Sequence, residues 1–238
     1  MASLKPSEMI ILLNSVLKTG SYIKPIESAK KNGDIEEEKR LINEVSYKWA
    51  SGLKKKFDID FDVINPENIP QEGPVCFVAN HESYCDILPF FTAVPFECSF
   101  VAKDEFRKVP LLGKWIERIR GVYIKRNDAR ASLKAINEGV EYIKEGFSLV
   151  IFPEGTRSRG PVQGEFKTGS FKLATKARAP IVPVSIKGSY KCYEGPGKIA
   201  RGERFQVYFH PTINIENLSR QEIIDLPKEI ENTIKAVL

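Results

Sequence analysis

The chain has 238 residues, of which 42% are hydrophobic and 28% charged, so it can bury a sizeable core and is globular rather than disordered. Its four cysteines form no Cys-x-x-Cys pair and it has only two histidines, which excludes a zinc-binding pattern and favours reduced thiols in a cytosolic protein. The net charge of +5 favours a polyanionic partner, and charge alone leaves nucleic acid, an anionic bilayer and a phosphorylated substrate open.

Residues 1–58 are predicted to form two helices without strands, arranged as a hairpin. The first helix has one apolar face, formed by Met9, Leu12, Leu13, Val16 and Leu17. The second has a face of its own, formed by Ile42, Val45, Trp49 and Leu53. The hairpin either packs against the core or docks on an anionic membrane, where its apolar side chains enter the headgroup zone and its lysines attract lipid.

The N-terminal part is not expected to cross a membrane. The apolar run from Met9 to Leu17 is interrupted by Asn14 and is far shorter than the roughly 20 residues that a spanning helix needs. The opening residues also lack the charged start, apolar centre and cleavage site of a secretory signal. We therefore expect no transmembrane helix.

From about residue 59 onward, short β-prone runs alternate with helical patterns. Candidate strands cover residues 75–78, 99–101, 122–124, 149–152, 181–186 and 205–209. This alternation predicts an α/β domain over residues 59–238, with a mostly parallel central sheet flanked by helices. The closing helix begins near the capping pattern at Ser219, and Pro227 is expected to move its true start a turn later.

His81 follows the first of these buried strands, and Asp86 lies five residues after it. In open α/β sheets, ligands bind at such strand ends. A neutral imidazole can take a proton from a hydroxyl near pH 7, and an aspartate on its other nitrogen fixes the tautomer and stabilises the imidazolium. The pair is therefore a candidate base with its orienting carboxylate, and the alternative is a histidine that is merely hydrogen-bonded. His210 is interpreted as a structural residue at a strand end.

Cations follow three other candidate strands. Residues 149–152 lead into a tight turn that ends at Arg157, and the two other runs end at Arg126 and Lys103. Each alone is typical of a solvated loop. Because the ends of parallel strands converge on one edge of a sheet, together they predict an anion site beside the base.

Four sequence blocks, taken in order, resemble the glycerophospholipid acyltransferase family, particularly the lysophosphatidic acid acyltransferases. The blocks are Asn80-His81-x4-Asp86, Gly121-Val122-Tyr123-Ile124-Lys125-Arg126, Phe152-Pro153-Glu154-Gly155-Thr156-Arg157-Ser158 and Ile181-Val182-Pro183-Val184. Phe166-Lys167-Thr168-Gly169 also fits, so the resemblance spans about residues 76–190. The departure is Lys125, at a position where the family often has an acid. The N-terminal hairpin resembles the membrane-docking element of bacterial members.

The resemblance implies transfer of a fatty acyl chain from acyl-CoA or acyl carrier protein to the 2-hydroxyl of lysophosphatidic acid, giving phosphatidic acid. His81 would deprotonate that hydroxyl and Asp86 would orient His81, with no covalent acyl-enzyme, so Ser83 and Cys85 would be bystanders. Glu154 would orient an arginine or accept from a glycerol hydroxyl. The residues expected to bind the acceptor are Lys103, Arg126, Glu154, Gly155, Thr156 and Arg157.

The resemblance calls for no metal and no bound cofactor, and it implies a peripheral protein on the cytoplasmic face of the membrane. One alternative is an acyltransferase acting on glycerol 3-phosphate or another lysolipid. A non-enzymatic alternative is a basic module that binds membrane or nucleic acid. We expect no nucleic-acid partner, because aromatic residues are not interleaved with basic ones as a stacking platform requires.

Overall fold

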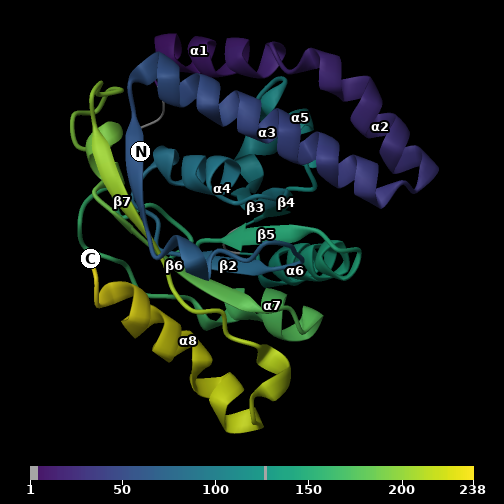
Figure 1. Ribbon diagram of the computed structural model, residues 1–238, viewed down its shortest axis with the longest axis vertical. Coiled ribbons are helices and arrows are strands. Elements are labelled where there is room, and N and C mark those ends of the chain that lie inside the picture. The colour runs from purple at the N-terminus through teal and green to yellow at the C-terminus, as the bar shows by residue number, and fades with distance from the viewer. Residues whose placement is uncertain (1–4, 126–127) are drawn as a thin grey trace.

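The computed structural model describes residues 5–125 and 128–238. These residues contain a seven-stranded sheet of order β1-β7-β6-β2-β5-β3-β4 (Figure 1). The five strands from β6 to β4 are parallel, whereas β7 is antiparallel to β6 and pairs in parallel with β1. The mostly parallel α/β sheet expected from the sequence is confirmed. Its strands are β1 (Asp60–Ile64), β2 (Cys76–Ala79), β3 (Cys98–Lys103), β4 (Val122–Ile124), β5 (Ser148–Ile151), β6 (Ile181–Lys187) and β7 (Arg204–Phe209).

Helices cover both faces of the sheet. In Figure 1, α7 and α8 lie below it, and α1 to α4 lie above it. Central strand β2 shows why both faces must be covered, because all four of its residues are buried. Phe77 and Ala79 belong to the core under α3 and α4, while Cys76 and Val78 belong to the core under α6 to α8. The helices after the hairpin are α4 (Leu88–Thr92), α5 (Leu112–Arg118), α6 (Ala129–Lys144), α7 (Lys172–Ala177) and α8 (Arg220–Lys235).

The N-terminal hairpin is present, with its first arm in two pieces. Helices α1 (Pro6–Leu17) and α2 (Ile23–Asn32) are joined by a 3-10 turn and run back along the long α3 (Ile35–Phe57) (Figure 1). The Asp34 side chain caps α3 by accepting from the Glu37 amide at 3.1 Å. Among the described residues, no helix combines the length and the apolar character needed to span a bilayer.

The two faces of α1 have different neighbours. Val16 is only 5% exposed and belongs to the core, so its predicted membrane-docking role is wrong. Leu17 is 56% exposed and Ile10, which the sequence reasoning omitted, is 58% exposed. Met9, Leu12 and Leu13 are half-buried. The apolar residues that the sequence pattern placed on one face of α1 therefore have different environments: some pack against the core and others are exposed.

A buried carboxylate joins α1 to the segment between β6 and β7. Glu8 is 8% exposed and accepts from the Tyr193 hydroxyl at 3.0 Å and the Ile199 amide at 3.2 Å. At the other end of the chain, the closing helix begins at Arg220 with Ser219 as its cap. Pro227 lies inside that helix, so the later start expected from it is wrong.

Candidate active site

The turn after β2 is fixed to the neighbouring strand β6. The Asn80 side chain donates to the Ile186 carbonyl at 2.8 Å and accepts from the Ile186 amide at 2.7 Å. This amide side chain is buried and imitates one more pair of the sheet ladder. Because Asn80 is fixed to β6, the chain leaves the sheet at a defined place and direction. His81, the next residue, is positioned accordingly.

His81 and Asp86 form the pair that the sequence predicted. Nδ1 of His81 lies 2.7 Å from Oδ2 of Asp86, with the imidazole side chain 18% exposed and the carboxylate fully buried. The same oxygen accepts from the backbone amides of Glu82 at 2.7 Å and Ser83 at 2.9 Å. An ionised carboxylate only accepts, so Nδ1 carries the hydrogen and Nε2 is left as the basic nitrogen.

The other Asp86 oxygen is held by Ser189, whose hydroxyl donates to Oδ1 in a short hydrogen bond. Ser189 also lies 3.3 Å from a carboxylate oxygen of Glu82, which accepts from the Gly188 amide at 2.9 Å. Burial raises the pKa of Glu82 to about 7, and the charge of Asp86 acts in the same direction. Sequence reasoning missed Ser189, because it lies 103 residues from Asp86 and follows a different strand.

The segment after β5 forms hydrogen bonds with both the amide and the carbonyl of His81. A Glu154 oxygen accepts from the His81 amide at 2.6 Å, and the Ser158 amide donates to the His81 carbonyl at 2.7 Å. The imidazole stacks on Phe152, with ring centres 4.1 Å apart. Burial raises the pKa of Glu154 to about 7. Its second oxygen accepts from the Gly164 amide at 2.8 Å, so Glu154 holds the backbone of His81 and not an arginine, contrary to expectation.

Arg157 is held by two residues that the sequence did not single out. Its Nη1 donates to Oε1 of Glu194 at 2.6 Å, and its guanidinium lies 3.5 Å from the ring centre of Tyr84. The Arg157 side chain is 13% exposed and that of Glu194 only 1%. Burial raises the pKa of Glu194, an effect that the charge of Arg157 opposes. Within the part of the chain that the structure describes, Arg157 donates a hydrogen bond only through Nη1, so its oriented guanidinium has further N–H groups beside the turn that carries His81.

The remaining predicted acceptor residues are less closely assembled. Gly155 adopts φ +68°, which favours glycine, and its amide already donates to the Phe152 carbonyl at 3.0 Å. Thr156 is exposed. Lys103 ends β3 and pairs with Glu105 at 2.6 Å, and β3 lies two strands from β2, a lateral separation of roughly 10 Å. Arg126 lies outside the described residues, after the end of β4.

Cys85 and Ser83 lack the features of a nucleophile. A hydrogen bond with Cys192 and burial raise the pKa of the Cys85 thiol well above its usual range, which disfavours the reactive thiolate. The Ser83 hydroxyl oxygen accepts from the Cys85 amide at 3.2 Å and serves as a turn cap. Neither residue is therefore set up to carry a covalent acyl group.

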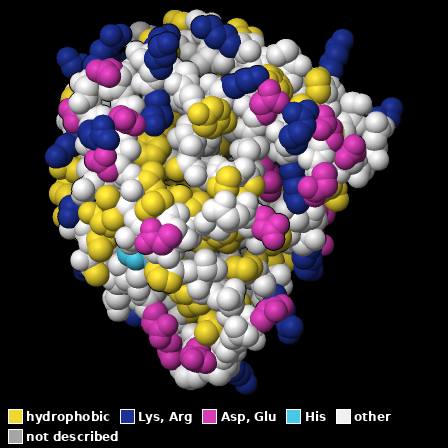
Figure 2. All heavy atoms as spheres, viewed as in Figure 1, with side chains coloured by type: hydrophobic (Ala, Val, Ile, Leu, Met, Phe, Trp, Pro, Cys, Tyr) yellow, Lys and Arg dark blue, Asp and Glu magenta, His cyan; other side chains and the backbone are white. Residues whose placement is uncertain are grey.

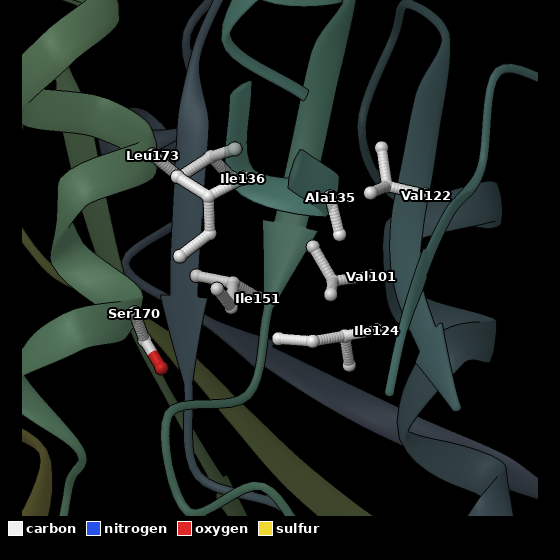
Figure 3. A pocket seen from close by; sticks show the side chains of 8 residues that line it. All are labelled: Val101, Val122, Ile124, Ala135, Ile136, Ile151, Ser170 and Leu173. Carbon is white, nitrogen blue, oxygen red and sulfur yellow. The ribbon is translucent and has the colours of Figure 1, made fainter. Parts of the chain in front are cut away.

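A small apolar cavity lies beside the carboxyl ends of β3, β4 and β5, between these strands and the helices α6 and α7 (Figure 3). Figure 3 shows Val101, Ile124 and Ile151 pointing into it from the three strands. Its volume of about 10 Å³ is that of a single water, too small for an acyl chain in this conformation.

The family model for acyltransferases matches residues 60–187, which is more than half of the chain. The chain belongs to the acyltransferase family. A Mycoplasma pneumoniae protein named "Probable 1-acyl-sn-glycerol-3-phosphate acyltransferase" is 31% identical over 228 residues, covering 90% of this acyltransferase and 82% of that protein. The 1-acyl-sn-glycerol-3-phosphate acyltransferase of Borreliella burgdorferi is 30% identical, covering 78% and 72% of the two chains.

The acyltransferase also resembles a solved structure along nearly its whole length. The 1-acyl-sn-glycerophosphate (LPA) acyltransferase PlsC from Thermotoga maritima matches with a TM-score of 0.73 at 26% identity, covering 95% of this chain and 93% of that one. A match of that extent includes the N-terminal helices as well as the sheet. Ser189 and Glu194 follow the residues matched by the family model, although each contacts a residue inside them.

Proposed function

We propose that this acyltransferase transfers a fatty acyl chain from a thioester donor to the 2-hydroxyl of lysophosphatidic acid, giving phosphatidic acid. The observation that carries the proposal is the His81–Asp86 pair at the end of β2, beside an arginine held ready at the end of β5. The names of the relatives support the same acceptor. The donor is either acyl-CoA or acyl carrier protein.

The residues support a mechanism without an acyl-enzyme. Nε2 of His81 takes the proton of the acceptor hydroxyl while the oxygen attacks the thioester carbonyl. The tetrahedral intermediate then expels the thiolate, which receives that proton from the imidazolium. Asp86 stabilises the imidazolium between these steps, since its carboxylate lies 2.7 Å from Nδ1.

Acceptor recognition is assigned to Arg157. A guanidinium offers five N–H donors, and Glu194 engages only Nη1, so further donors are left for a phosphate. In the acceptor, two carbons separate the phosphate oxygen from the 2-hydroxyl. Binding of the phosphate therefore positions that hydroxyl against Nε2 of His81. Arg126 and Lys103 are proposed as additional cations at the same edge of the sheet.

The N-terminal hairpin is proposed to dock on the cytoplasmic face of the membrane. Ile10 and Leu17 are seven residues apart, two turns of α1, and both are exposed. Large exposed apolar side chains on a helix edged with lysines are typical of interfacial docking. A peripheral location also brings the site to its lipid acceptor.

The decisive experiment measures thioester consumption by the pure protein. Acyl-CoA and acyl carrier protein are each combined with lysophosphatidic acid, glycerol 3-phosphate and lysophosphatidylcholine. We expect turnover with lysophosphatidic acid, a loss of roughly 10² to 10⁴ in kcat for His81→Ala, and a small effect for the matched control Cys85→Ala. Preference for glycerol 3-phosphate would replace the proposed acceptor. A trapped acyl group on Ser83 or Cys85 would replace the mechanism.

A further inference from the structure

A hollow of about 180 Å³ lies between α1 and α3 in the N-terminal hairpin. Trp49 and Leu53 are among its apolar lining, and Lys18, Lys48 and Lys56 also line it. The indole N–H of Trp49 donates to the Ser15 hydroxyl at 2.9 Å, so the ring is fixed across the gap between the two helices. The hollow therefore combines a rigid apolar wall with cations, as an amphiphilic anion requires.

Gly52 keeps this hollow open. Lys48, Gly52 and Lys56 are spaced by four residues and form one stripe along α3. Glycine is among the poorest residues for a helix interior, yet a Cβ built on Gly52 meets nothing within 4 Å. Packing does not explain the glycine. Its missing side chain leaves room between the two lysines of the stripe.

The charges around the hollow are unbalanced. Lys48 pairs with Glu44 at 2.6 Å. Within residues 5–125 and 128–238, Lys18 and Lys56 form no ion pair. Figure 2 shows Lys and Arg side chains gathered along the edge of the molecule where α1 lies in Figure 1. A dianionic group is favoured beside three lysines of which, among the described residues, only Lys48 has an ion pair.

We propose that the hollow binds the phosphate headgroup of one anionic glycerophospholipid, separately from the acceptor in the active site. The phosphate is held by Lys18, Lys48 and Lys56, and the glycerol and first methylenes lie against Trp49 and Leu53. This inference rests on the proposed membrane docking and adds a specific lipid-binding site to it. The hairpin then recognises an individual lipid molecule in addition to a charged, apolar surface.

The test titrates water-soluble dihexanoyl phosphatidic acid into the protein by calorimetry, in an Arg157→Ala background that weakens the proposed acceptor site. Gly52→Leu fills the hollow, leaves every charge in place and favours the helix. We expect it to weaken binding by about tenfold or more, because the added side chain takes the space proposed for the headgroup and so denies it at least one hydrogen bond to a lysine. Lys56→Gln should weaken binding several-fold, and its neighbour Lys55→Gln, which does not line the hollow, should leave it unchanged.

Three outcomes would overturn the proposal. Gly52→Leu could bind like its parent. Lys55→Gln and Lys56→Gln could lose affinity equally, which is diffuse electrostatic attraction. Inorganic phosphate could bind as tightly as the lipid, which is a free-phosphate site. If Gly52→Leu fails to fold by circular dichroism, the Lys18→Gln/Lys56→Gln double variant decides between the same outcomes. If the protein binds the same number of lipid molecules with and without Arg157→Ala, the result argues against Arg157 as the acceptor site. It does not affect the hollow, which is tested by the Gly52 and Lys56 variants.

Discussion

Asp86→Asn separates the charge of the orienting residue from its geometry. In the structure, one Asp86 oxygen accepts three N–H groups, from His81 and the amides of Glu82 and Ser83. Ser189 holds the other oxygen and lies 3.3 Å from Glu82, which can accept its hydroxyl hydrogen instead. An asparagine therefore fits with its oxygen toward the three N–H groups and its amide toward Ser189. The tautomer of His81 is kept, and only the charge is lost.

The expected cost follows from Coulomb's law. Unit charges about 4 Å apart at an effective dielectric constant of about 20 attract by roughly 4 kcal/mol. Because each step of about 1.4 kcal/mol changes a rate tenfold, a transition state with a fully formed imidazolium would lose about 10³ in kcat. Ser189→Ala alone should reduce kcat only slightly, because the two oxygens of the Asp86 carboxylate are equivalent and either can accept from His81. In the Asp86→Asn protein the side-chain oxygen should keep its place without Ser189, because a turned NH₂ would face the backbone amides of Glu82 and Ser83, so the free energies of the two changes should add.

The assay is steady-state thioester consumption, with kcat measured for the single variants, the double variant and the parent, and with thermal melting as a control for folding. A near-normal kcat for Asp86→Asn would refute the electrostatic role of the carboxylate. A loss in the double variant well beyond the sum of the two single losses would refute the orientation assigned to the asparagine amide.

The other predictions concern burial, the acceptor and the membrane. Burial raises the pKa of Glu154 from 4.5 to about 7, so the folded protein binds this proton more tightly than the unfolded chain, and its contribution to stability falls as pH rises through that window. Relative to the parent, Glu154→Gln should gain up to roughly 3 kcal/mol in unfolding free energy between pH 4.5 and 8, measured by urea melts, and a constant difference would contradict the assignment. Arg157→Lys and Glu194→Gln should each raise the acceptor KM about tenfold and leave the donor KM unchanged, because the first loses the planar guanidinium fork and the second loses the carboxylate charge that orients it. Equal effects on both KM values would remove Arg157 from that role. Leu17→Asp should release the protein from anionic vesicles with its melting temperature nearly unchanged, whereas Val16→Asp, which buries a charge, should destabilise the fold by roughly 3 kcal/mol or more. Full sedimentation of a folded Leu17→Asp/Ile10→Asp protein would show that α1 does not dock.

The sheet was predictable where its strands are buried on both faces. Strands β2, β5 and β6 are mostly apolar and almost wholly buried, so the sequence located them within about one residue. Strand β1 was missed because it carries Asp60 and Asp62, which pair with Arg204 on the neighbouring β7 at 3.4 Å and 2.5 Å. An acidic run indicates a strand only once the cation opposite it is known.

The site was predictable only where its partners are close in the sequence. His81 and Asp86 are five residues apart and belong to one turn. Ser189 and Glu194 reach the site from the segment after β6, and no local pattern marks either of them. The role of Glu154 was also hidden, because its partners are backbone amides, which every residue except proline possesses.

The Glu8 contacts imply that the hairpin is not a removable anchor. The segment fastened to α1 through Tyr193 and Ile199 also carries Glu194, the partner of Arg157. Removing residues 1–58 would take away the Glu8 carboxylate that the Tyr193 hydroxyl and the Ile199 amide contact, and would loosen the segment that carries Glu194. An engineered exchange of the hairpin should therefore include residues 193–199, because the two segments are joined through Glu8.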